Sequence, residues 1–327
     1  MRTLRPFAAN WFYPCLLVCF LLTMQSAQAQ ESSAKAVLAP KIVFAITDKT
    51  FPAEWLKAPT LVHAEPIPAS DENRSTRAIR TALAIYPPRF LADNLSTIYV
   101  VSHLSEGQTT VGGFGNSETK AIYINNDGQS AAYTDFVIER GVHHELAHLL
   151  YANHPRNISF LQWQGLNTAG FHYGAGSLEW LKDNVKHPSD DLLTNEKFLA
   201  QGFVRDYALC DVEEDFASTV EALLSGSPEL WQAFDRYEII KKKVGMAIAF
   251  YQSLDKTMTE SFFRHIPPTI AYLPTDYNAG DVVLFPDGGS VTIPGKNGAA
   301  SLKFDVPVGG SAVLGEDTIV VFNPHKP

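Results

Sequence analysis

The hydrophobic residues of the stretch 134–155 recur at steps of three and four, which predicts an amphipathic helix. Thr134 or Asp135 can cap the start of this helix, and Pro155 favours its end. Its apolar positions are Val137, Ile138, Val142, Leu146, Leu149 and Leu150.

Upstream of this helix, the pattern predicts short strands at 41–46, 97–101 and 121–125 and a helix at 75–86. The Gly-rich stretch 112–116 lacks the lysine and the helix of a phosphate-binding loop, so we interpret it as a turn. The strand at 121–125 directly precedes the central helix. It is either an ordinary inner strand or a sheet edge that can bind an extended peptide by strand addition.

Downstream, residues 156–187 are rich in Gly, Asn and aromatic residues, and we expect an ordered, irregular wall of a cleft. Helices are then expected at 212–224, at 228 to about 254 and at 258 to about 265. From Pro267 onward, short β-branched runs alternate with Gly, Pro and Asn turns. This texture predicts a small all-β appendage.

The central helix contains the pattern H-E-x-x-H at His144, Glu145 and His148. Residues four apart on a helix lie on one face, so both imidazoles can bind one ion, and zinc accepts neutral imidazole nitrogen readily. Glu145 stands beside the first histidine, where its carboxylate can reach water that a zinc ion activates. His143 has Ala147 four residues later and therefore has no partner on its own face; we expect it beside the site.

The first 29 residues have the features of a secretory signal peptide: basic Arg2 and Arg5, a short apolar run, and Ala27 to Ala29 as the cleavage site. We therefore expect a periplasmic or secreted protein with no stable membrane insertion after cleavage. Removing Arg2 and Arg5 from the 26 basic residues leaves 24 against 35 acidic ones, a net charge of −11. This charge argues against nucleic acid as a partner. Only Cys210 remains after cleavage, so the mature chain has no internal disulfide.

A catalytic zinc needs a third protein ligand, and the residues leave several candidates. His154 has the spacing of a longer histidine signature, but Tyr151 stands where that signature has glycine. The acidic stretch from Asp211 offers Glu213 and Glu214, although acids in a first helical turn are also ordinary capping residues. Helical periodicity alone does not decide between these two carboxylates.

Several short segments share a pattern with known proteins: 86–91 (YPPRFL), 142–148 (VHHELAH), 166–167 (LN), 170–174 (GFHYG), 202–204 (GFV) and 214–217 (EDFA). Together these segments resemble the zinc-binding metallopeptidases of bacterial envelopes. The chain is more distantly similar to the gluzincin catalytic domain of anthrax lethal factor. The resemblance covers roughly residues 80–225.

The resemblance implies that Glu214 is the third zinc ligand and that Tyr207, seven residues upstream, stabilises the transition state. In such proteins the pattern that begins at Glu214 usually ends in Glu, whereas this chain has Ser218. If that acid orients a ligand histidine, its loss weakens metal binding about 10–100-fold unless Asp215 or Glu221 replaces it.

Together these features predict an α+β fold: a zincin-like domain at 41–266, with a small sheet, the metal helix and C-terminal helices, and a β-rich appendage at 267–327. A signal peptide at 1–29 and a flexible lead-in at 30–40 precede them. The expected function is that of an exported zinc metallopeptidase of the gluzincin type, with a peptide or protein substrate. The alternatives are a zinc-stabilised envelope binding protein that does not cleave, and a zinc hydrolase that acts on cell-wall peptide.

Overall fold

The computed structural model describes residues 39–183, 192–266 and six short strands after them, at 271–272, 282–285, 289–293, 302–306, 310–314 and 319–322. The predicted signal peptide and most of the lead-in lie outside the described residues, so both stay predictions. None of the helices in the described ranges has the length and apolarity needed to cross a lipid bilayer.

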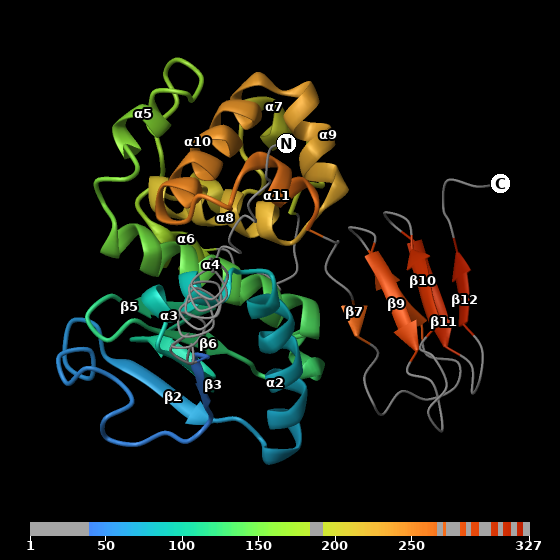
Figure 1. Cartoon of the computed structure of the whole chain (residues 1–327). Helices are drawn as coiled ribbons and strands as arrows, with labels where there is room; N and C mark the ends of the chain where they lie inside the picture. Colours follow the sequence, from blue (N-terminus) through green and yellow to red (C-terminus); the bar gives the residue numbers. More distant parts are fainter. Residues whose placement is uncertain are drawn as a thin grey trace, which may run out of the picture. The chain divides into compact units, whose positions relative to one another are not determined.

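A mixed six-stranded sheet forms one layer of the part up to residue 266 (Figure 1). Its main path runs β1-β3-β6-β5, with β1 and β6 parallel to β3 and β5 antiparallel to β6. Two further strands, β2 and β4, pair with β3. The strands are β1 (Lys41–Val43), β2 (Val62–Pro66), β3 (Thr97–Glu106), β4 (Thr109–Thr110), β5 (Gly113–Asn116) and β6 (Ala121–Asn125).

The structure corrects one sequence interpretation of this sheet and decides another that was left open. The Gly-rich stretch, interpreted as a turn, forms strand β5, and β5 ends the main path of the sheet. Strand β6 pairs with β3 on one side and β5 on the other, so it is an ordinary inner strand and not an edge. The sequence pattern missed β5 because three of its four residues, Gly113, Gly115 and Asn116, are typical of turns.

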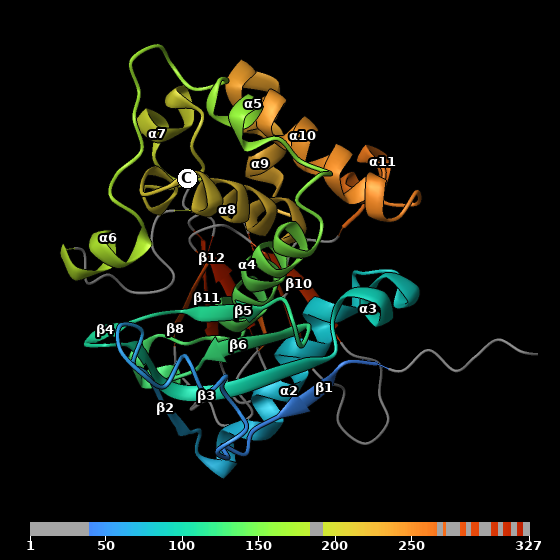
Figure 2. The same ribbon diagram turned by 90° about the vertical axis from the view of Figure 1, so that its left-hand side faces the viewer.

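Helix α4 lies between the sheet and helices α8, α9 and α10 (Figure 2). It contacts β5 and β6, packs against α2 and crosses α8. The helices are α2 (Ala69–Ala84), α3 (Pro88–Asn94), α4 (Asp135–Asn153), α5 (Phe160–Gln164), α6 (Ser177–Asp183), α7 (Glu196–Gln201), α8 (Val212–Leu224), α9 (Pro228–Arg236), α10 (Glu238–Leu254) and α11 (Glu260–Arg264), with 3-10 turns η1 (Gln129–Ala131) and η2 (Tyr207–Leu209). The protein is therefore of mixed α+β class.

The helix expected at 228–254 is in fact two helices, α9 and α10. Tyr237 separates them because its backbone is extended, with φ −117° and ψ 113°, and its hydroxyl donates a hydrogen bond to Glu196 on α7. The stretch 156–187 contains the short helices α5 and α6 in its described part. The strand β2 and the helices α3 and α7 were not predicted.

The sheet buries both of its faces, because side chains of successive strand residues point to opposite faces. On β6, Ile122 and Ile124 join the main core with α2, α4, α8 and α10, while Tyr123 joins a smaller cluster on the other face. Leu178 and Leu181 of α6 pack against that second cluster. Helix α4 is thus enclosed by the sheet, α2 and α8, and its polar residues need partners inside the protein.

The described residues after 270 form two three-stranded sheets. The first has the order β10-β9-β7 and the second β12-β11-β8. Whether these strands form a domain of their own stays a prediction. Their bounds are β7 (Ala271–Tyr272), β8 (Val282–Phe285), β9 (Gly289–Ile293), β10 (Leu302–Val306), β11 (Gly310–Leu314) and β12 (Ile319–Phe322).

Candidate metal centre

Helix α4 places the two histidines of the H-E-x-x-H pattern side by side. The helix begins after Thr134, whose side chain accepts a hydrogen bond from the Val137 amide, and it runs to Asn153. His144 and His148 follow one another by one turn, and their Nε2 atoms lie 3.1 Å apart. Both rings therefore face the same point in space.

Helix α8 brings a carboxylate to this point. Asp211 caps the helix, because its Oδ1 accepts a hydrogen bond from the Glu214 amide at 2.8 Å. In the first turn Glu213 is exposed, whereas Glu214 is 8 % exposed and points at the two histidines. Its Oε2 lies 2.9 Å from Nε2 of His144 and 3.4 Å from Nε2 of His148. Of the two carboxylates that periodicity left open, the structure places Glu214 at the histidines.

The donor atoms fit the dimensions of a zinc site. Ligand atoms about 2.0–2.1 Å from a tetrahedral zinc lie about 3.3 Å from one another, which is close to the three separations above. Among the described residues, this is the one group of three His, Cys, Asp or Glu side chains whose potential ligand atoms all lie within 4.8 Å of one another. His144, His148 and Glu214 are therefore the residues that would hold the metal.

The charges of the three groups depend on each other. Burial alone would raise the pKa of the Glu214 carboxyl, but the two imidazoles overcome this effect and hold that pKa well below its usual range. Burial would lower the pKa of His144, but hydrogen bonds to Glu214 and Glu221 raise it to about 10. Both effects come from the attraction between the imidazoles and the carboxylates, and zinc binding to neutral imidazole would release any proton that this attraction holds on the rings.

Glu145 lies in α4 against the end strand of the sheet. It is 7 % exposed, and burial raises the pKa of its carboxyl, an effect that the two histidines oppose. The backbone of Gly113 in β5 comes so close that a Cβ atom there would lie 2.5 Å from Cγ of Glu145. The glycine thus leaves room for the carboxylate predicted to be the base.

Tyr207 lies in the 3-10 turn η2, directly before the cap of α8. The centroid of its ring is 6.2 Å from that of His144, and Trp180 of α6 contacts its ring at 5.1 Å. Burial, together with the charge of Glu214 and a hydrogen bond to it, raises the pKa of the Tyr207 hydroxyl well above its usual value. The hydroxyl is therefore protonated beside His144, and its role at the transition state stays a prediction.

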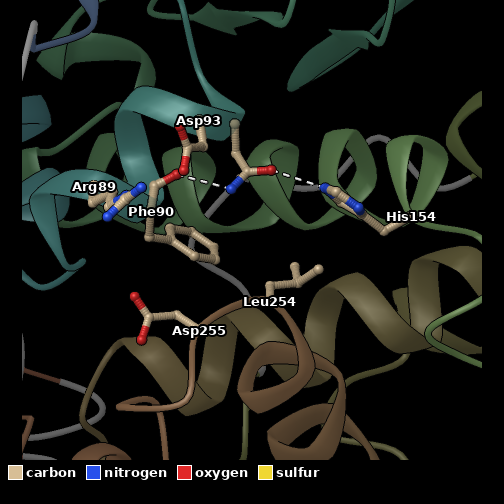
Figure 3. A pocket seen from close by; sticks show the side chains of 7 residues that line it. Arg89, Phe90, Asp93, His154, Leu254 and Asp255 are labelled. Atoms are coloured by element: carbon tan, nitrogen blue, oxygen red, sulfur yellow. Dashed lines mark hydrogen bonds between the residues drawn. The ribbon is translucent and has the colours of Figure 1, made fainter.

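Two other histidines lie apart from the group. His154 and Asn94 line a pocket of about 300 Å³, and Nε2 of His154 lies 2.9 Å from the amide oxygen of Asn94 (Figure 3). Arg89, Asp93 and Asp255 also line this pocket. His143 is fully buried on another face of α4, where its Nδ1 is 2.8 Å from the hydroxyl of Tyr86.

Asp215, the neighbour of Glu214, points away from the histidines. Its Oδ2 accepts hydrogen bonds from Trp163 at 2.8 Å, from Tyr173 at 2.6 Å and from Lys243 at 2.7 Å. This buried group attaches the aromatic stretch after α4 to α8 and α10. These contacts rule out Asp215 as the carboxylate that orients a ligand histidine.

The sequence analysis named Asp215 and Glu221 as possible replacements for the acid that orients a ligand histidine, and it did not decide between them. The structure shows which of them contacts Nδ1 of His144, the ring nitrogen that faces away from Glu214. That residue is Glu221, whose Oε2 lies 3.1 Å from Nδ1 of His144. Arg140 and Arg205, which also contact Glu221, were not predicted at all. The available signal was the spacing 214, 218, 221, which places all three residues on one face of a helix.

The protein has an α+β fold, and a buried helix presents two imidazoles to a carboxylate from a second helix. These features place it in the class of proteins with a candidate mononuclear zinc site. The chain belongs to the family described as "Putative zinc-binding metallo-peptidase", which matches residues 104–270, just over half of its length.

Among solved structures, the crystal structure of a putative zinc-binding metallo-peptidase from Bacteroides caccae ATCC 43185 is similar to the chain. The identity is 15 % and the TM-score 0.41, and the similarity covers 70 % of this chain and 87 % of that one. No curated protein matches the chain.

Proposed function

We propose that the protein is a zinc-dependent peptidase of the gluzincin type with a zincin-like catalytic domain. One observation carries the proposal: Oε2 of Glu214 lies 2.9 and 3.4 Å from the imidazole nitrogens of His144 and His148, which come from the H-E-x-x-H helix. This is the His2Glu donor set of catalytic zinc sites that leave a fourth position open. Membership in the metallopeptidase family supports the same reading.

Zinc bound by these residues would supply Lewis-acid polarisation of the scissile carbonyl and lower the pKa of a water molecule to about 7. The protein supplies the proton transfers. Glu145 takes a proton from the attacking water and passes it to the leaving amine. Tyr207 donates a hydrogen bond to the oxyanion that forms from the carbonyl.

The end strand β5 supports an extended peptide as the substrate. Among the described strands, β5 pairs with β6 alone, and its Gly113 lies against Glu145. A substrate segment that adds to the outer side of β5 would pass next to the carboxylate that moves the proton. We therefore propose that a substrate adds as a strand to β5. The sequence analysis had considered this mode of binding for residues 121–125.

Export completes the proposal. The signal-peptide features of residues 1–29 support cleavage after Ala29 and a periplasmic or secreted location, where the substrate is a peptide, a protein or cell-wall peptide.

The test compares single variants of the purified, mature protein. We expect one zinc per chain, and we expect Glu145→Gln to keep that zinc while losing about 100- to 10,000-fold in kcat on a peptide library that includes cell-wall peptides. Glu214→Gln is expected to lose the metal, whereas the matched control Glu213→Gln changes an exposed neighbouring carboxylate and is expected to keep both metal and activity. Cleavage that survives Glu145→Gln would refute the peptidase mechanism. Zinc binding without cleavage of any peptide would instead favour the binding protein.

A further inference from the structure

Both ring nitrogens of His144 face a carboxylate. Nε2 lies 2.9 Å from Oε2 of Glu214, at the proposed zinc position, and Nδ1 lies 3.1 Å from Oε2 of Glu221 on the opposite side of the ring. When Nδ1–H donates to Glu221, the lone pair of Nε2 is free to bind a metal. The position of Glu221 thus selects the tautomer that zinc requires.

Two arginines hold Glu221 in this position. Arg140, one turn before His144 on α4, donates from Nε to Oε1 at 2.6 Å. Arg205 approaches from the segment before α8 and donates from Nη1 to Oε2 at 3.0 Å and to Oε1 at 3.2 Å. The carboxylate is 4 % exposed. Three hydrogen-bond partners hold the Glu221 carboxylate in place, so this carboxylate has little freedom to rotate away from His144.

Ser218 occupies the turn of α8 between Glu214 and Glu221. It lies one turn after Glu214, is fully buried, and its Oγ has no hydrogen-bond partner among the described residues. In the proteins that the chain resembles, this place usually carries Glu. The serine is too short to supply a carboxylate, and Glu221, a further turn along the same helix, contacts His144 instead.

We propose that Glu221 is the positioning residue of the metal centre, a role displaced from position 218 to position 221 in this chain. Glu221 orients His144 and raises the basicity of its Nε2, and Arg140 and Arg205 orient Glu221. This inference rests on the proposed zinc site and adds the residue that tunes it.

The experiment measures zinc affinity by competition with a chromogenic chelator, alongside the Tm of the metal-free protein. Glu221→Gln removes the negative charge beside His144, and we expect the Kd for zinc to rise about 10–100-fold. The control Ser218→Ala, on the same buried face, is expected to leave the Kd unchanged because the serine hydroxyl has no partner there. The absorption spectrum of the cobalt-substituted protein is expected to change in Glu221→Gln and not in Ser218→Ala, since the geometry of a ligand imidazole changes only in the former.

A second variant separates positioning from simple charge balance. Glu221→Asp keeps the negative charge that faces Arg140 and Arg205, but its carboxylate is one methylene shorter and cannot keep both the arginine and the His144 contacts. We expect its metal-free Tm to stay near that of the unaltered protein and its zinc Kd to rise. This variant also decides the matter if Glu221→Gln does not fold.

The outcomes are distinct. Zinc affinity that is unchanged in Glu221→Asp, or that falls equally in Ser218→Ala, would overturn the positioning role while the proposed function stands. Failure of the unaltered protein to bind zinc at all would overturn both.

Discussion

The close approach of β5 to α4 can be tested by adding one carbon atom, with Gly113→Ala. A Cβ at Gly113 would lie 2.5 Å from Cγ of Glu145, 2.6 Å from its Cδ and 2.5 Å from the carbonyl oxygen of Tyr123. The first two atoms belong to the proposed base. The third belongs to the backbone of β6, to which β5 is hydrogen-bonded, and it cannot rotate away.

The magnitude follows from these distances. Non-bonded heavy atoms are most stable about 3.5 Å apart or more, so β5 or Glu145 must shift by about 1 Å. Overpacking of this kind costs about 1–3 kcal/mol of the free energy of unfolding, or roughly 2–12 °C in Tm for a domain of this size. A displacement of about 1 Å at a catalytic group can reduce kcat about 100-fold.

The assay combines urea unfolding, zinc content and peptide cleavage. Gly113→Ala is expected to lose stability and activity but to keep its zinc, because the three ligands come from α4 and α8 and not from the sheet. Gly112→Ala is the matched control: it makes the same chemical change one residue away, where the backbone φ is not positive and a Cβ meets nothing within 4 Å. If the two variants agree in stability within about 0.5 kcal/mol and have the same kcat, β5 does not constrain Glu145 and the reasoning is wrong.

Three further predictions concern buried charges and the metal. Asp215→Asn leaves the ammonium of Lys243, 2.7 Å away and fully buried, without its counter-charge, and should cost about 3–5 kcal/mol in urea unfolding; recovery is expected when Lys243→Met is added. Burial raises the pKa of Glu139 to about 9, so the folded protein keeps a proton that the unfolded chain loses above about pH 4.5. The free energy of unfolding then falls by up to about 1.4 kcal/mol per pH unit between about pH 4.5 and pH 9. Glu139→Met removes this dependence, so it should become more stable than the unaltered protein as pH rises from about 5 to 8. A stability difference between the two proteins that does not depend on pH would contradict this. Zinc at about 100 times its Kd should add about 2.7 kcal/mol of stability, measured as a higher Tm that a chelator removes, with no such shift in Glu214→Gln.

Sequence reasoning was most successful where periodicity and capping agreed. The helix expected within 134–155 is α4, and the one at 212–224 matches α8 residue for residue. The motif histidines follow from α4 because a four-residue step on a helix fixes their relative direction. Their convergence with Glu214 is a tertiary contact between α4 and α8, which no local pattern encodes.

Local patterns failed where the deciding interaction was distant in sequence. Strand β5 has three turn-forming residues out of four, and only its pairing with β6 and its contact with α4 make it a strand. The choice between Glu213 and Glu214 depends on where Asp211 starts α8. Once that cap is fixed, Glu214 turns inward and Glu213 stays in solvent.

The enclosure of α4 explains why its polar residues have such separate roles. One stripe, with Arg140, His144 and His148 at four-residue steps, faces α8 and carries the candidate metal centre. A second stripe, with Asp135, Glu139 and His143, is buried on another face, where Arg74 of α2 binds Asp135 at 3.0 Å and Tyr86 binds His143.

The two adjacent histidines of the motif therefore belong to different environments. Burial lowers the pKa of His143 to about 3, which keeps its ring neutral beside Tyr86, while carboxylates raise the pKa of His144. A helix exposed on one side could leave such polar groups to water. Because most of α4 is buried, neighbouring elements supply partners for several of these groups, and the acid on α8 that contacts His144 is also the one proposed to tune the metal.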